Sequence, residues 1–80
     1  MSSPEVILYT RRGCHLCDEA HAVLSRYGLE VRSVDIDQDA ELRVKYNECV
    51  PVVVIDGRER FRGRVEPLLL ERLLTRRTDH

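Results

Sequence analysis

Two cysteines, Cys14 and Cys17, form the most reactive pair of side chains in this sequence and are separated by two residues. Thiols separated by two residues can close into a disulfide with little movement of the backbone. An apolar run at residues 6–9 precedes the pair and a helical pattern follows it, so we expect the pair at the start of a helix. There the leading thiol meets unpaired backbone N–H groups and the positive end of the helix dipole, which both stabilise a thiolate. Since thiolates attack disulfides, this placement predicts thiol–disulfide chemistry.

The two thiols are expected to have different roles. Cys14, just before the first helical turn, is predicted to be the exposed nucleophile. Cys17, one turn into the helix, is predicted to be more buried and less acidic, and to be the resolving thiol that displaces a mixed disulfide. His15 lies between them. A charged imidazole there would favour the Cys14 thiolate, whereas a solvent-exposed histidine would have little effect.

A metal site is the sharpest alternative interpretation of the same residues. Cys17 and His21 are four residues apart and therefore share a helix face. Together with Cys14, and with Cys49 as a fourth ligand, they have a plausible spacing for zinc. Cys49 could instead be a small buried hydrophobic residue or a third redox partner. We expect no bound metal, because thiol–disulfide chemistry already explains the pair; a redox-silent interaction domain is a further alternative.

Length and composition predict one domain, residues 1–80, in an ordinary globular class. Hydrophobic residues make up 42% of the chain and charged residues 34%. The net charge of −1 gives no support for binding to nucleic acid or to an anionic membrane. No apolar run approaches the roughly 20 residues that cross a bilayer, and the first residues do not resemble a signal peptide. Three cysteines, two of them clustered, are not the disulfide framework of a secreted protein, so we expect a cytoplasmic protein. We also expect it to be a monomer.

The chain reads as alternating strands and helices. The expected strands are residues 5–10, 29–36, 51–55 and 58–62. The expected helices are residues 14–27, a second helix that starts in the acid-rich residues 37–41 and carries Leu42 and Tyr46, and residues 65–76. Asp56-Gly57 is a strong signal for a two-residue hairpin, and the tail from Thr75 to His80 is expected to fray. The order β-α-β-α-β-β-α predicts an α/β fold with a four-stranded mixed sheet flanked by helices.

Several motifs, in this order, resemble the thioredoxin superfamily and, within it, the glutaredoxins. Residues 8–17 resemble the active-site strand and loop of glutaredoxins. Residues 34–37 ahead of an acidic helix start are also typical, as is Val50-Pro51 opening an apolar strand. The resemblance extends over about residues 5–75 and implies a thioredoxin-like fold.

The resemblance also implies roles for residues around the dithiol. Arg11 stands where the family has a basic residue that pairs with a glutathione carboxylate. Pro51 is expected to follow a cis peptide bond, which would leave the backbone N–H and C=O of Val50 free to pair with an extended thiol peptide. Arg64 stands near the expected position of the γ-glutamyl end of glutathione.

Two features depart from the family pattern. His15 and Leu16 replace the usual Pro-Tyr between the cysteines, and Gly63 stands alone where the family has a Gly-Gly pair. The chain looks more like the small bacterial glutaredoxin-like proteins.

Four arginines alternate with other residues near the last predicted strand: Arg58, Arg60, Arg62 and Arg64. On a strand they would share one face, and the last two should approach Pro51 and the dithiol. This face is predicted to guide glutathione or an acidic protein to the dithiol. For Arg58 and Arg60 a charged edge that discourages aggregation is the favoured alternative.

We therefore expect a dithiol oxidoreductase that binds no resident cofactor. Its predicted substrate is a disulfide-containing protein or a glutathione mixed disulfide. Glutathione is a candidate co-substrate, and a thioredoxin or glutathione reductase system is the candidate source of electrons.

Overall fold

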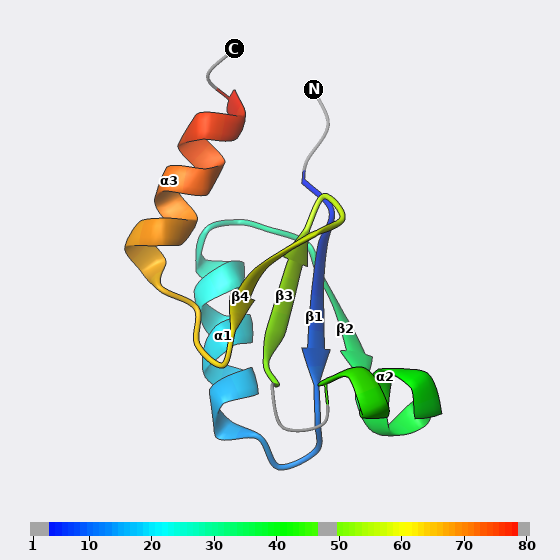
Figure 1. Cartoon of the computed structure of the whole chain (residues 1–80). Helices are drawn as coiled ribbons and strands as arrows, with labels where there is room; N and C mark the ends of the chain where they lie inside the picture. Colours follow the sequence, from blue (N-terminus) through cyan, green and yellow to red (C-terminus); the bar gives the residue numbers. More distant parts are fainter. Residues whose placement is uncertain (1–3, 47–49, 79–80) are drawn as a thin grey trace.

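The computed structural model describes residues 4–46 and 50–78 of the chain (Figure 1). Its elements are, in order, β1 (Val6–Thr10), α1 (His15–Arg26), β2 (Val31–Asp35), the 3₁₀ turn η1 (Ile36–Gln38), α2 (Ala40–Tyr46), β3 (Val52–Ile55), β4 (Arg58–Arg62) and α3 (Pro67–Thr78). This order confirms the predicted β-α-β-α-β-β-α arrangement and adds η1 to it.

The strands form one mixed sheet in the order β2-β1-β3-β4. β1 pairs in parallel with β2, as a βαβ unit requires, and antiparallel with β3, which pairs antiparallel with β4. The registers place Thr10 opposite Asp35 and Tyr9 opposite Val52. The last residues of β1 and β2 and the first residues of β3 therefore meet at one end of the sheet. The loop into α1 starts at that end.

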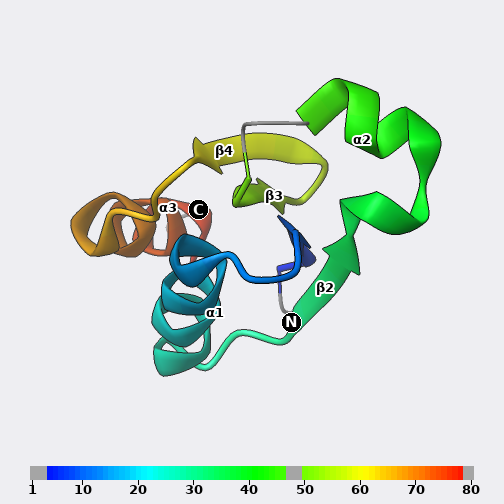
Figure 2. The same ribbon diagram turned by 90° about the horizontal axis from the view of Figure 1, so that it is seen from below.

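Helices cover both faces of this sheet, as predicted. α1 and α3 lie on one face and α2 on the other (Figure 2). The larger core, beneath α1 and α3, contains Leu24 and Leu70, both completely buried. The smaller core, beneath α2, contains Ile36, Tyr46 and Val52. Burial of apolar surface on both faces holds the central strands in place.

The acid-rich segment after β2 forms two caps. Asp35 Oδ1 accepts a backbone N–H of η1 at 2.9 Å. Asp39 Oδ1 accepts two backbone N–H groups of the first turn of α2, at 2.9 and 3.3 Å. The prediction of a helix start within the acid-rich residues 37–41 is confirmed, since the carboxylate of Asp39 caps the helix and α2 begins at Ala40.

The second strand is shorter than predicted. β2 covers Val31–Asp35 instead of residues 29–36. At its start, the N–H of Leu29 still bonds to the C=O of Leu24 and so belongs to the end of α1. At its end, Ile36 is the first residue of η1.

The last helix begins and ends later than predicted. Pro67 is its first residue, a position that suits proline because the N–H it lacks would have no partner there. Val65, expected inside the helix, is instead buried in the larger core. The helix continues to Thr78, so the prediction of a fraying tail was wrong for Thr75–Thr78, and Leu74 packs against the core near that end. In the described part of the chain, no helix has both the length and the apolar character needed to cross a bilayer.

The hairpin between β3 and β4 is the predicted one, but β4 contains a bulge. Asp56 and Gly57 have φ angles of 50° and 81°, which match a two-residue type I′ turn. The pairing of β3 with β4 shifts between Val53, opposite Phe61, and Val54, opposite Glu59. This shift leaves one extra residue in β4. The residues before the extra one therefore lie on the opposite face of the sheet from the one that strict alternation along the whole strand would give them.

Candidate active site

Cys14 is the N-cap residue of α1. Its backbone is extended, with φ −91° and ψ 106°, and its C=O accepts the N–H of Asp18 at 3.3 Å. Its Sγ accepts the backbone N–H of Cys17 at 3.1 Å. The sulfur thus takes the position that a Ser or Asp oxygen takes in an ordinary cap. A backbone N–H and the positive end of a helix dipole both stabilise an anion at this position. The Cys14 residue is half-buried, and so less exposed than the sequence predicted.

Cys17 points into the protein from the first turn of α1. Only 3% of its surface is exposed, and neither it nor Cys14 forms a disulfide in this structure. The pKa of its thiol is raised from 9.0 to about 12, first by burial and then by the hydrogen bond to Cys14, against an opposing effect of the Arg11 backbone. The charges of Cys14 and Asp18 raise this pKa further. The prediction of a more buried and less acidic second thiol is confirmed.

The start of β3 lies at the same end of the sheet as the loop that carries Cys14. The Val50-Pro51 peptide bond is cis, as the resemblance implied. Pro51 is buried, and its C=O accepts the N–H of Gly63 at 2.7 Å. Gly63 has a φ of 85°, which glycine adopts without steric cost. This hydrogen bond holds the segment after β4 against the start of β3.

Arg11 follows β1 directly and is held by a carboxylate of the chain itself. Its Nε and Nη2 donate to Asp37 Oδ2 and Oδ1 at 3.1 and 3.0 Å, which is a bidentate ion pair. Each side chain is 36% exposed. The pairing of Arg11 with a glutathione carboxylate stays a prediction, and such a carboxylate would meet a guanidinium that Asp37 already holds.

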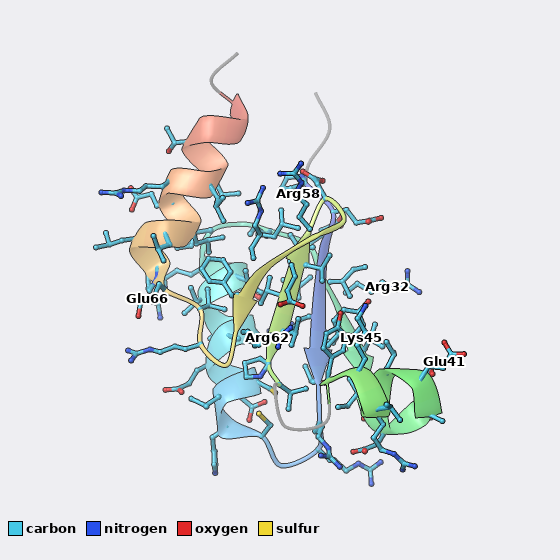
Figure 3. The ribbon with its side chains drawn as sticks, viewed as in Figure 1. Arg32, Glu41, Lys45, Arg58, Arg62 and Glu66 are labelled. Carbon is cyan, nitrogen blue, oxygen red and sulfur yellow. The ribbon has the colours of Figure 1, made fainter. Side chains whose placement is uncertain are left out.

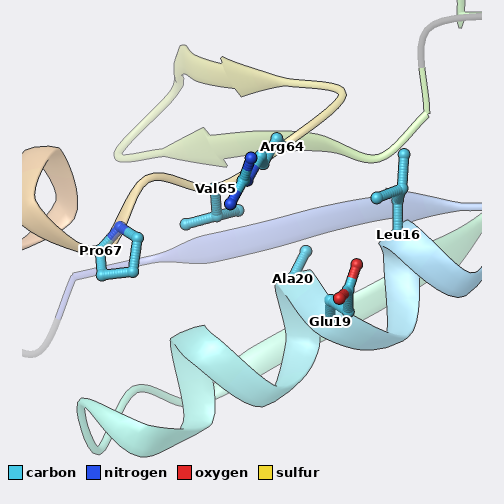
Figure 4. A pocket seen from close by; sticks show the side chains of 6 residues that line it. All are labelled: Leu16, Glu19, Ala20, Arg64, Val65 and Pro67. Carbon is cyan, nitrogen blue, oxygen red and sulfur yellow. The ribbon is translucent and has the colours of Figure 1, made fainter.

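A groove of about 360 Å³ lies between α1 and the segment that leads into α3 (Figure 4). It is lined by Leu16, Glu19, Ala20, Arg64, Val65 and Pro67. Leu16, from between the two cysteines, is 47% exposed. Arg64 has a largely exposed side chain whose Nε lies 3.9 Å from Glu66 Oε1, too far for a strong ion pair. Arg64 therefore stands across a groove from the helix that carries the dithiol.

The other arginines do not form the predicted row on one face. Arg58 is opposite Ile55, a residue of the larger core, whereas Arg62 is opposite Val52, a residue of the smaller core. The two side chains lie at different ends of β4 (Figure 3). The Nε and Nη2 of Arg62 bond to Glu59 Oε2 at 3.0 and 2.8 Å. The predicted basic face was wrong because the bulge separates the arginines and a carboxylate pairs with one of them.

The histidines of α1 are exposed. His15 lies in the first turn, and His21 Nδ1 lies 3.4 Å from Ser25 Oγ. Within residues 4–46 and 50–78, no three His, Cys, Asp or Glu side chains are grouped so that they could hold a metal ion. Cys49 is outside the described residues. Its predicted roles as a zinc ligand, a buried residue or a third thiol therefore stay predictions.

Two carboxylates, those of Asp37 and Glu59, were not predicted as partners of arginines. The sequence places Asp37 in a glutaredoxin-like motif and an acidic helix start, and it gives Glu59 no role. A signal for Asp37 was present, because parallel strands bring the residues that follow them to one end of a sheet. The pairing of Glu59 with Arg62 had no such signal, since it depends on the bulge in β4.

Residues 5–75 match the family model described as "Glutaredoxin-like domain (DUF836)". The chain belongs to this glutaredoxin-like family. An uncharacterized protein of Mycobacterium tuberculosis is 32% identical to this glutaredoxin-like domain over 87 residues, which cover 98% of the chain and 90% of the relative.

Solved structures agree with this membership. An X-ray structure of a structural genomics target protein from X. campestris has 34% identity and a TM-score of 0.75, covering 89% of this chain and 96% of its own. The glutaredoxin from Archaeoglobus fulgidus has 26% identity and a TM-score of 0.65, covering 88% and 85%. A thioredoxin variant from Halobacterium salinarum, at 19% identity and a TM-score of 0.71, shows the fold alone, covering 99% and 78%. The glutaredoxin-like domain therefore has the predicted thioredoxin-like fold, and the resemblance seen in the sequence is confirmed.

Proposed function

We propose that this glutaredoxin-like domain is a thiol–disulfide oxidoreductase in which Cys14 attacks a substrate disulfide and Cys17 resolves the product. The unlike environments of the two thiols carry the proposal. Cys14 caps a helix and accepts a backbone N–H, whereas Cys17 is almost fully buried and its pKa is raised to about 12. This asymmetry suits one attacking thiol and one resolving thiol.

The proposed reaction has two exchange steps. In the first, the Cys14 thiolate, having lost its proton to solvent, forms a bond to one sulfur of the substrate. The substrate S–S bond breaks, and the other sulfur leaves as a thiolate that takes up a proton. In the second, Cys17 loses its proton and attacks Cys14 Sγ, which displaces the remaining substrate thiol. The dithiol has then lost two electrons to form the Cys14–Cys17 disulfide, and the substrate has gained two electrons and two protons.

Formation of the mixed disulfide also changes Cys17. Two of the influences that raise its pKa, a hydrogen bond and a charge, come from Cys14. Once Cys14 is bonded to a substrate sulfur, it carries no negative charge and its sulfur is a weaker acceptor for the Cys17 S–H, so both influences weaken. The Cys17 thiol therefore becomes easier to ionise at the step that needs its thiolate.

Residues near the dithiol are assigned to substrate binding within this proposal. The backbone of Val50, beside Pro51, would pair with the extended segment that carries the substrate cysteine. Arg11 and Arg64 would meet its anionic groups, and His15 would modulate the charge beside the nucleophile. The substrate is a disulfide-containing protein or a glutathione mixed disulfide. Glutathione or a reductase system returns the dithiol to its reduced form, and the cycle requires no resident cofactor.

Turnover of a glutathione mixed disulfide by three variants tests the proposal. We expect Cys14→Ser to be inactive, because no attacking sulfur remains. Cys17→Ser should keep activity only when excess glutathione replaces the resolving thiol. Cys49→Ser removes the third cysteine and so shows how much of the measured activity depends on Cys49 and how much on the Cys14–Cys17 pair. Full activity of Cys14→Ser would overturn the proposal.

A further inference from the structure

The ion pair between Arg11 and Asp37 is a contact between two segments that meet only in the folded chain. The residues are 26 positions apart, and both bonds of the fork are short, at 3.1 and 3.0 Å. The parallel pairing of β1 with β2 sets Thr10 opposite Asp35, so the residues that follow these strands emerge side by side. Each side chain stays 36% exposed, so solvent and ligands can reach the pair.

This ion pair lies beside the proposed dithiol. Arg11 is three residues before Cys14, and its backbone is close enough to the Cys17 thiol to lower the pKa of that group. A guanidinium at this position would attract the carboxylate of an incoming substrate. Asp37 already occupies the fork of the guanidinium in the geometry that such a carboxylate would use.

We propose that Asp37 is a specificity-determining residue that makes the dithiol select against disulfides carrying carboxylates close to the reacting sulfurs. A substrate carboxylate must displace Asp37, which is part of the same chain and so is present at a high effective concentration. The cost of displacement falls on anionic small disulfides and not on neutral ones. The favoured substrates are therefore disulfides that have no carboxylate near the reacting sulfurs, such as a disulfide within a protein segment. Small anionic disulfides are disfavoured. This inference rests on the proposed oxidoreductase function.

Two small disulfides of similar size test the inference, with dithiothreitol as the reductant. Dithiodipropionate carries a carboxylate at each end, and hydroxyethyl disulfide carries none. The measured quantity is the ratio of kcat/KM for the anionic disulfide to that for the neutral one. We expect Asp37→Asn to raise this ratio about three- to fivefold over wild type, at the upper end of the range that an exposed ion pair permits. Asp37→Ser is a second variant in which the ion pair with Arg11 is removed. Far-UV circular dichroism reports whether each variant is folded.

Two further variants distinguish release of Arg11 from a general change of charge. Glu41→Gln also removes one negative charge, but from the outer side of α2, where Glu41 points away from the sheet (Figure 3). Its ratio should stay within twofold of wild type. In Arg11→Gln combined with Asp37→Asn, the gain should vanish, because the guanidinium that binds the carboxylate is gone.

Three outcomes would overturn the inference. The ratio could stay unchanged in both folded Asp37 variants, it could rise equally in Glu41→Gln, or the gain could survive the loss of Arg11. In these cases wild-type turnover of hydroxyethyl disulfide would still support the oxidoreductase. If wild type reduces neither disulfide, the proposed function and the inference fail together.

Discussion

The backbone N–H of Cys17 donates a hydrogen bond to Cys14 Sγ at 3.1 Å, so the sulfur of the first cysteine caps the helix that carries the second. This bond supplies a positive dipole to the Cys14 sulfur, whereas Cys17 itself is buried. The predictions that follow depend on this contact, on the buried core and on the capping carboxylates.

Alkylation should distinguish the two thiols at neutral pH. Cys17 is 3% exposed and its pKa is about 12, so its thiolate is scarce and poorly accessible. We expect iodoacetamide to modify folded Cys17→Ser, which keeps Cys14, at least tenfold faster than folded Cys14→Ser, with both variants also carrying Cys49→Ser. Burial, the largest of the causes that raise the Cys17 pKa, remains in Cys14→Ser, and a rise of one pKa unit lowers the thiolate fraction at neutral pH about tenfold. Mass spectrometry measures the rates. Equal rates in the folded variants would contradict the assignment of roles.

The stability of the reduced protein should fall at alkaline pH because of Cys17. Its pKa is raised on folding, from 9.0 to about 12, so the folded state holds a proton that the unfolded state releases. The stabilisation is fully present below pH 9 and is lost as the pH rises towards 12. We expect a loss of a few kcal/mol in the free energy of unfolding across this window, measured by urea denaturation.

Other groups also titrate in this alkaline window, so the control is a difference between proteins. Cys17→Ala removes the buried thiol and should show a shallower fall of stability between pH 9 and 12 than wild type. If both proteins lose stability with the same slope, Cys17 is not responsible for it.

The carboxylate of Asp39 should stabilise α2. It accepts two backbone N–H groups of the first turn, so Asp39→Ala should lower the free energy of unfolding by about 1 kcal/mol. Arg43→Ala, at an exposed position of the same helix, is the matched control and should change it by less than about 0.5 kcal/mol. Denaturant unfolding measures both. An equal effect of the two substitutions would show that the cap contributes nothing.

Leu24 should be the anchor of α1 on the sheet. It is completely buried in the larger core, so Leu24→Ala removes apolar contacts and leaves a cavity, at a cost of about 3 kcal/mol. Val44 is 84% exposed on α2, and Val44→Ala should be nearly neutral. Thermal unfolding compares the two variants. A loss below about 1 kcal/mol for Leu24→Ala would mean that the core collapses around the gap.

Much of the fold could be predicted from the sequence because its signals are local. The spacing of apolar residues in 14–27 is enough to predict α1, and Asp56-Gly57 is enough to predict the hairpin. The boundaries that were wrong depend on competition between neighbouring groups. Asp35 caps η1, so β2 ends before Ile36, and Pro67 starts the helix that Val65 was expected to open.

The pair of thiols, its place at the start of a helix and the likeness to glutaredoxins can all be predicted from the sequence, since each depends on residues close together in the chain. What surrounds that pair depends on how the whole chain folds. The parallel strands bring Asp37 to Arg11 across 26 positions, and one extra residue in β4 turns Arg58 and Arg62 to opposite faces. Such contacts depend on register and on bulges, which are set by the packing of the whole sheet and not by any short stretch of residues.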